Sequence, residues 1–373
     1  MNPLLQILRL AALSLAVQFC LDALVFRTGW YGDYLEPESY AGSYEATLLN
    51  EQTRRLAGSH RVLVLGDSAI AEGFSAPLAN QTVADPDWFF SNAGTPAATP
   101  RAWYYLLRDL DPNAKRYNVI VLPVTDYADA DGLEPPDIDK EADRDVDLNR
   151  LIVRLRLTDT FTFPFTYLDP EKKFNALAGT LFKGYVYSRD VQEFLRAPVA
   201  RLAKLDLYDE HSREWKDAYT GQNGSLEGLT YDPARGKFGF PPSFAPAVRE
   251  AIEARQHPER LRVEGYRRAY REKWLGAIIN RYQAAGATIV LFRVPFRPVP
   301  LHAAVSPNGP TFVEQVGRMP RVVVLDPNLF ADLETPALFF DAWHMNSSGR
   351  TEFTPRLARA VVDAVNSARG KTP

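Results

Sequence analysis

Short, mostly apolar runs recur along the chain and alternate with longer segments of mixed polarity. The runs lie at residues 61–65, 88–94, 119–124, 287–294 and 321–325. Runs of this length, rich in β-branched and aromatic residues, are typical of strands buried in a parallel sheet. Apolar positions with helical spacing lie between or after them, at residues 69–74, 101–110, 263–285 and 349–366. This alternation predicts an α/β fold of three layers with a mostly parallel sheet.

Between about residues 127 and 262 the alternation stops, which predicts a helical insertion. An acidic stretch opens it, made of Asp126, Asp129, Asp131, Glu134, Asp137 and Asp139. Helices are expected at residues 148–157 and 173–181, and loops at residues 223–225 and 231–242. Inserted segments of compact domains are often lids or binding elements. The acidic stretch lacks the ligand spacing and the central glycine of a calcium loop, so a solvated surface is the better interpretation.

The N-terminal residues 4–26 are mostly apolar and about long enough to cross a bilayer as a helix. The polar exceptions are Gln6, Arg9, Ser14, Gln18 and Asp22. Ser14, Gln18 and Asp22 are spaced four apart and therefore share one face of a helix. Polar groups inside a membrane usually face a protein partner or a cavity rather than lipid. The stripe therefore indicates a partner helix.

Two other roles fit an apolar N-terminal segment: a cleaved signal peptide, or a buried amphipathic helix of a soluble domain. Residues 25–30 lack the small-x-small site that signal peptidase needs, so an uncleaved signal anchor is favoured. Arg9 and Arg27 flank the span evenly and do not fix its orientation. The expected organisation is a membrane anchor at residues 1–28, a connector at 29–60 with a helix near 44–57, and an α/β domain at 61–373.

Composition narrows the classes of function. The chain has 373 residues, is 46% hydrophobic and carries a formal net charge of -3, which is ample for one large domain with an insertion. The near-neutral charge gives no electrostatic basis for binding nucleic acid. A single cysteine excludes an intrachain disulfide, and no Cys/His spacing indicates a structural metal. We therefore expect neither a metal nor a cofactor.

The first apolar run ends at Gly66-Asp67-Ser68. Gly66 permits a tight turn that would lift the next side chains above the end of the sheet. A serine at the carboxyl end of a strand lies where open α/β sheets bind their ligands. The alternative is that Asp67 or Ser68 only caps the helix expected at residues 69–74.

A partner for Ser68 stands near the C-terminus, where Asp341 and His344 are three residues apart. A serine nucleophile needs a base to take its proton, and the base needs a carboxylate to fix its tautomer. The single turn that carries Asp341 and His344 can supply both the base and the carboxylate. The chain order Ser68, Asp341, His344 is no obstacle, because such triads are defined by role. The alternative is a surface histidine beside a helix cap, although His344 alone of the five histidines follows a carboxylate in such a turn.

Three short motifs together resemble the GDSL or SGNH hydrolase family: Gly66-Asp67-Ser68, Asn92-Ala93-Gly94 and Asp341-Ala342-Trp343-His344. The resemblance covers the blocks from about residue 60 to the C-terminus but not the insertion. It implies an SGNH-like fold with Ser68 as nucleophile and Asp341 and His344 as its partners. It also implies an oxyanion hole made by the amides of Ser68 and Gly94. The third block normally carries an asparagine where this chain has Thr125, whose hydroxyl can also donate.

Met345-Asn346 and Gly349 resemble the continuation found in members that O-acylate envelope polymers, such as alginate acetylation and teichoic acid D-alanylation proteins. The resemblance implies acyl transfer from a donor to an extracytoplasmic polysaccharide, as an O-acetyltransferase or an esterase. It further implies a single-pass protein of the cytoplasmic (inner) membrane with a periplasmic catalytic domain, beside a multi-pass membrane acyltransferase. The alternative is a catalytically inactive binding subunit of such a complex.

Positive charges follow the run at residues 287–294, near the expected active face. Arg293, Arg297 and His302 lie at or just past its carboxyl end. They would suit contact with an anionic sugar or a lipid headgroup. Ordinary loop charges are the alternative interpretation. We carry Arg293 and Arg297 forward as candidate substrate-binding residues.

Overall fold

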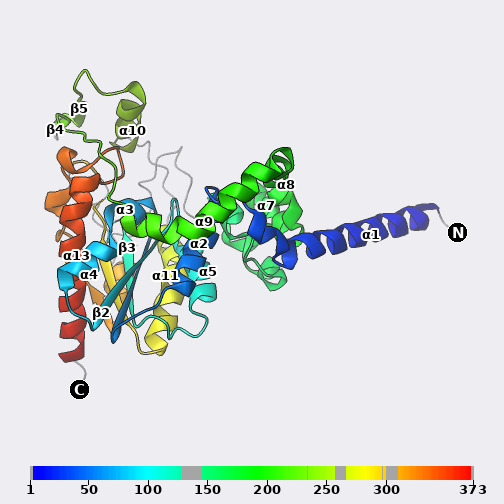
Figure 1. Cartoon of the computed structure of the whole chain (residues 1–373), viewed down its shortest axis with the longest axis horizontal. Helices are drawn as coiled ribbons and strands as arrows, with labels where there is room; N and C mark the ends of the chain where they lie inside the picture. The colour runs from blue at the N-terminus through cyan, green and yellow to red at the C-terminus, as the bar shows by residue number, and fades with distance from the viewer. Residues whose placement is uncertain are drawn as a thin grey trace. The chain divides into compact units, whose positions relative to one another are not determined.

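The computed structural model describes residues 3–125, 127, 145–232, 234–256, 266–295, 297–299 and 310–370 (Figure 1). Contacts divide the chain into two compact units. Unit 1 contains residues 1–49 and 139–212, and unit 2 contains residues 50–138 and 213–373. The segment expected to be a connector and the segment expected to be an insertion are therefore each shared between the two units.

Unit 2 is built on a five-stranded sheet whose neighbouring strands are all parallel. Its strands are β1 (His60–Gly66), β2 (Trp88–Gly94), β3 (Val119–Val124), β6 (Thr288–Arg293) and β7 (Val322–Val324), in the order β2-β1-β3-β6-β7. Each lies in one of the five apolar runs of the sequence. The expected α/β class with a mostly parallel sheet is therefore confirmed.

Helices cover both faces of this sheet (Figure 1). On one face α13 packs against α3, α4 and β6, and on the other α11 packs against α5 and β6. Their bounds are α3 (Ser68–Gly73), α4 (Ala76–Val83), α5 (Pro100–Leu110), α11 (Tyr266–Ala284) and α13 (Ser347–Gly370). The first face is closed by the fully buried Phe353, Leu357 and Val361 of α13.

Three features of unit 2 differ from the sequence prediction. Helix α4 was missed, although Ser75 caps it by accepting from the Leu78 amide at 3.3 Å. Helix α5 begins one residue early, at Pro100, because proline suits the first helical position. A loop was expected at residues 231–242, but a hairpin of β4 (Thr230–Asp232) and β5 (Lys237–Gly239) forms there. Short helices complete the unit: α10 (Pro246–Gln256), α12 (Phe312–Val316), η6 (Ala331–Leu333) and η7 (Pro336–Leu338).

The strand order fixes where a ligand can bind. The chain passes from β1 to β2 on one side and from β3 to β6 on the other, so the order reverses between β1 and β3. In open α/β sheets, ligands bind beyond the carboxyl ends of the strands at this point. The register pairs Gly66 with Gly94 on β2 and Val64 with Val121 on β3. Thr125 follows the end of β3 and Ser68 follows the turn at the end of β1, so both come after the carboxyl ends of neighbouring strands.

Unit 1 is helical in the residues described. It contains α1 (Pro3–Asp22), η1 (Ala23–Arg27), η2 (Trp30–Tyr34), α6 (Asp145–Leu151), η4 (Leu157–Phe161), η5 (Pro164–Thr166), α7 (Pro170–Leu181) and α8 (Lys183–Arg196). Helices α2 (Tyr40–Thr53) and α9 (Pro198–Ala218) run from one unit into the other. The helix expected at residues 148–157 is shorter and earlier, as α6. The helix expected at residues 173–181 starts earlier, as α7.

The apolar N-terminal segment forms a helix that projects from α7 and α8 (Figure 1). Among the described residues, 3–27 are the one helical stretch long and apolar enough to cross a membrane by length and composition. None of its most apolar window is buried in the protein. A buried core helix would show the opposite, so that alternative is disfavoured.

Candidate active site

The turn after β1 places Ser68 at the head of α3. The Asp67 side chain caps this helix, accepting from the Ala69 amide at 2.9 Å. Ser68 is the first helical residue, so its amide has no acceptor within the helix. Only glycine fits at position 66, two residues before Ser68, because a Cβ there would lie 2.2 Å from Ile70 Cγ1. Capping thus belongs to Asp67, and the Ser68 hydroxyl has another partner.

That partner is His344, and the three predicted side chains form one hydrogen-bonded chain. Ser68 Oγ lies 2.8 Å from His344 Nε2, and His344 Nδ1 lies 2.7 Å from Asp341 Oδ2. An Nδ1–H that donates to Asp341 leaves the Nε2 lone pair facing the serine hydroxyl. The ring is therefore oriented to accept the Ser68 proton.

Asp341 is held as a carboxylate. Its Oδ1 accepts from the amides of Trp343 at 2.7 Å and His344 at 2.8 Å, which leaves Oδ2 for the imidazole. Burial alone would raise the pKa of Asp341, but the hydrogen bonds from His344 and Trp343 outweigh it and hold that pKa below its ordinary value. A negative charge beside His344 stabilises the imidazolium that forms when the ring takes a proton.

The loop that carries Asp341 and His344 is fixed by Asn346, which is 4% exposed. Its Nδ2 donates to the carbonyls of Gly224 at 2.8 Å and Ala337 at 2.7 Å, and its Oδ1 accepts from the Gly349 amide at 2.9 Å. This side chain joins three segments: the loop before Asp341, the start of α13, and the segment around Gly224. It thereby holds the backbone two residues after His344.

The segment around Gly224 was expected only to be a loop, and its place beside the site was not foreseen. The Ser347 amide donates to the Gln222 carbonyl at 2.8 Å, and the Leu226 amide donates to the Phe339 carbonyl at 2.9 Å. A Cβ on Gly224 would lie 2.9 Å from the Phe340 Cβ, so glycine allows the close approach. The glycines in the polar run around Gly224 were a signal in the sequence for such a close approach.

The Gly94 amide does not match its expected role as an oxyanion donor. It donates instead to the side-chain oxygen of Asn92 at 2.8 Å, inside the protein. Asn92 in turn donates to the Phe74 carbonyl at 2.8 Å, which ties the end of β2 to α3. A Cβ on Gly94 would lie 2.7 Å from the Ala71 amide nitrogen. Gly94 therefore serves close packing of β2 on α3, and we do not retain it in the oxyanion hole.

Thr125 lies immediately after β3 and is half-buried. It stands at the carboxyl end of β3, the strand that neighbours β1. Its role as a donor stays a prediction.

Arg293 also has a different partner from the one expected. Its Nη2 lies 2.8 Å from both carboxylate oxygens of Glu334, and the two side chains are 10% and 1% exposed. The Arg293 guanidinium is thus paired with a buried carboxylate inside the protein. We therefore assign Arg293 to the fold rather than to substrate binding. Arg297 is half-buried just past β6, and its substrate role stays a prediction. His302 and the acidic stretch from Asp126 to Asp139 lie outside the described residues.

The fold and the site define the chain as an α/β protein with a serine–histidine–aspartate constellation at the switch point of a parallel sheet. Within the described ranges, no group of three or more His, Cys, Asp or Glu side chains is placed to hold a metal ion. No family model, curated protein or solved structure matches the chain.

Proposed function

We propose that the chain is a serine-dependent acyltransferase or esterase that works through an acyl-Ser68 intermediate. The observation that supports it is the chain of contacts from Ser68 Oγ to His344 at 2.8 Å and from His344 to Asp341 at 2.7 Å. A capping serine or a surface histidine needs neither contact. Both distances lie in the range of good hydrogen bonds.

The proposed reaction has two halves. His344 Nε2 takes the hydroxyl proton as Ser68 Oγ attacks the acyl carbonyl, and the imidazolium then returns that proton to the departing alcohol. A second hydroxyl, from a sugar or from water, gives its proton to His344 and attacks the acyl-serine. The acyl group leaves on the new oxygen, and Ser68 regains its proton. Asp341 stabilises the imidazolium in both halves.

The oxyanion that forms in each half needs preorganised donors. The Ser68 amide, at the head of α3, is the first. The Thr125 hydroxyl, at the end of the adjacent strand, is the second in our proposal. With the Gly94 amide occupied, the hole rests on fewer donors than the family resemblance implies.

The acceptor class follows from the resemblance and from the N-terminal helix. The motif at Asp341 to Gly349 resembles that of proteins that acylate envelope polysaccharides, and residues 3–27 would tether the domain to a membrane. We propose an uncleaved anchor in the cytoplasmic membrane with the site on the extracytoplasmic side. Retention is supported by unit 1, because Asp22 accepts from the Lys183 amide and Arg27 donates to the Leu181 carbonyl. Removing residues 1–28 would take away the acceptor at the start of α8 and the donor at the end of α7.

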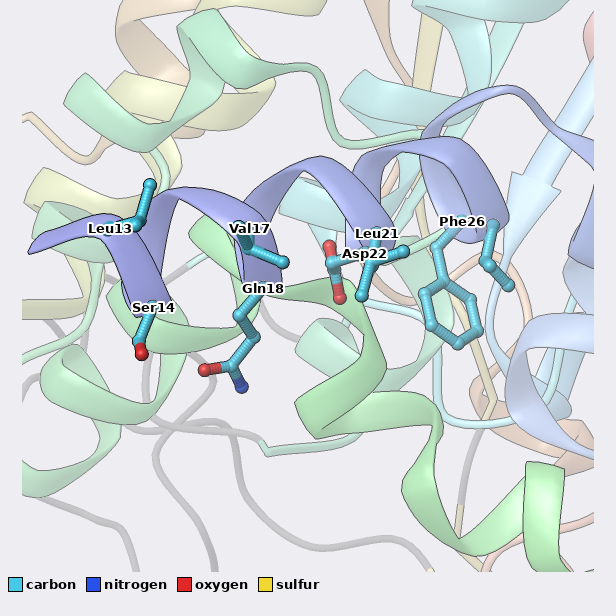
Figure 2. A pocket seen from close by; sticks show the side chains of 8 residues that line it. Leu13, Ser14, Val17, Gln18, Leu21, Asp22 and Phe26 are labelled. Carbon is cyan, nitrogen blue, oxygen red and sulfur yellow. The ribbon is translucent and has the colours of Figure 1, made fainter. Parts of the chain in front are cut away.

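The anchor also bears on a partner. The polar stripe expected to face another helix is shorter than its spacing suggested, because Asp22 is occupied by α8. Ser14 and Gln18 remain on that face (Figure 2). They lie on an open helix face that also carries Leu13, Val17 and Leu21. We propose that a multi-pass membrane acyltransferase, which would supply the acyl group, packs here.

A fluorophosphonate probe tests the activity directly, because it labels only a serine that a base activates. Wild-type protein should be labelled, and Ser68→Ala should not. Absence of labelling in folded wild-type protein would favour the second candidate, an inactive binding subunit that keeps the fold. The occupied Gly94 amide is the observation in favour of that candidate. Labelling with acetyl transfer to water but not to oligosaccharides would identify an esterase.

A further inference from the structure

Four of the exposed large apolar side chains of unit 1 lie close together in sequence, on η4, η5 and α7. Leu157, Phe161, Phe165 and Phe174 are 48%, 79%, 60% and 67% exposed. We call these four residues the apolar foot. They lie on η4, η5 and the first turns of α7, and α7 packs against both short helices. Exposed aromatic side chains gathered on neighbouring elements mark an interaction surface more often than chance.

The exposure is built into ordered structure. Phe163 and Tyr167 alternate with the exposed rings, and they are 0% and 2% exposed. Their rings meet edge to face at 5.5 Å between centroids. Asp159 closes the turn before them by accepting from the Arg156 amide at 2.7 Å. The inward rings thus fix the backbone, and the rings between them are directed outward.

The same unit is joined to the candidate membrane helix. Asp22 accepts from the amides of Lys183 at 3.0 Å and Gly184 at 2.6 Å, which caps the start of α8. Arg27 donates to the Leu181 carbonyl at 2.9 Å, at the end of α7. A carboxylate at a helix N-terminus and a guanidinium at a helix C-terminus both match the helix dipoles. The end of the span is therefore fixed to the junction of α7 and α8.

That junction lies at the level of the membrane surface if α1 crosses the bilayer. Residues 3–21 rise about 28 Å as a helix, close to the hydrocarbon thickness of about 30 Å. Phe19, inside this stretch, meets the Phe182 ring edge to face at 6.0 Å, and Phe182 is the residue between α7 and α8. Phe174 is about 12 Å from Phe182 along α7. Because α7 packs against both short helices, the apolar foot lies within reach of this junction.

We propose that the apolar foot lies in the interface of the bilayer that α1 crosses, so that unit 1 rests on the membrane as well as being tethered to it. Phenylalanine and leucine side chains suit the boundary between headgroups and acyl chains, where interfacial segments bury their apolar face about 5–10 Å deep. We commit to the bilayer because α1 brings it to unit 1 wherever it spans, with or without a bound partner protein. The proposal needs the span but not the catalytic activity.

The single cysteine makes the test direct. Cys20, in α1, is exposed and is the one cysteine of the sequence. In a full-length Cys20→Ser background, Phe161→Cys and Phe165→Cys would each carry an environment-sensitive fluorophore, in vesicles of phosphatidylethanolamine and phosphatidylglycerol. Label on the native Cys20 is the membrane-embedded reference. Glu210→Cys, on a side chain 75% exposed in α9, is the reference in water.

Labels at residues 161 and 165 should emit further to the blue than the label at residue 210. Brominated lipids should quench them, and aqueous iodide should not. If both labels behave like the one at residue 210 in vesicles, the proposal is wrong. Labels that iodide reaches in these vesicles but not in native membranes would also overturn it, because a membrane protein would then cover the foot. Because both side chains are exposed, the substitutions should leave circular dichroism unchanged.

Discussion

Asp22, at the end of the N-terminal helix, accepts a hydrogen bond from the Gly184 amide at 2.6 Å, so the apolar helix is joined to the folded part of unit 1. A Cβ on Gly184 would lie 2.9 Å from the same carboxylate oxygen and 2.8 Å from Phe26 Cε2. The contact therefore depends on glycine at one position and on a short acid at the other. A helix that served only to cross a membrane would need neither.

This contact predicts a stability effect for a residue that composition alone would place inside the membrane. Asp22→Ala should destabilise unit 1 by about 1–3 kcal/mol, because two backbone amides at the start of α8 would lose their acceptor. Thermal unfolding of the full-length protein in detergent measures it. Ser14→Ala, on the same face of α1 but exposed, is the matched control and should leave the melting temperature unchanged. Equal melting temperatures for both variants would show that Asp22 does not cap α8.

The second prediction concerns the nucleophile and its base. Ser68→Ala and His344→Ala should each abolish turnover of a chromogenic acetate ester and leave the fold intact. The double variant should be little worse than either single one, because the pair acts as a unit. Steady-state rates with circular dichroism as the control check this. Near-wild-type turnover in either single variant would contradict the acyl-serine mechanism.

Features that depend on a short stretch of sequence could be predicted, and contacts between distant residues could not. The strands could be predicted because each is a continuous apolar run, which is the pattern of a strand buried on both faces of a parallel sheet. Ser68 and His344 are 276 residues apart, yet both could be named because each belongs to a short motif. The acceptor of the Gly94 amide and the acid that pairs with Arg293 could not be predicted. Each depends on which side chain the fold brings beside it.

The lowered pKa of Asp341 makes a prediction about pH. A carboxyl whose folded pKa lies below its unfolded value stabilises the fold above the unfolded pKa, and that stability is lost as pH falls through the folded pKa. Asp341→Asn should therefore be less stable than wild type at neutral pH. The difference should shrink below about pH 4, near the ordinary pKa of an aspartate. Chemical denaturation at several pH values measures it, and a pH-independent difference would contradict it.

The fourth prediction separates a structural from a substrate-binding role for Arg293. Arg293→Met should destabilise unit 2 by about 3–5 kcal/mol, because Glu334 would remain buried without its counter-ion. Adding Glu334→Gln should recover much of that loss, since no buried charge then remains. Denaturant unfolding of the three variants gives the comparison. If Arg293→Met unfolds like wild type but loses affinity for anionic substrates, Arg293 belongs to the site.

The last prediction tests Thr125, which directly follows β3, the strand that neighbours β1. If its hydroxyl donates to the oxyanion, Thr125→Val removes the donor and nearly preserves the shape. Loss of one such donor typically costs on the order of a hundred-fold in kcat. KM should change far less, because the negative charge develops mainly in the transition state.

Thr125→Asn is the discriminating partner of that variant, because it restores an amide donor where the family resemblance places one. Its longer side chain should recover part of the rate that Thr125→Val loses, with no gain in melting temperature. The occupied Gly94 amide sharpens the expectation, since that amide would not compensate for the lost hydroxyl. Unaltered kcat in a folded Thr125→Val protein would leave the Ser68 amide as the remaining donor of the proposed hole.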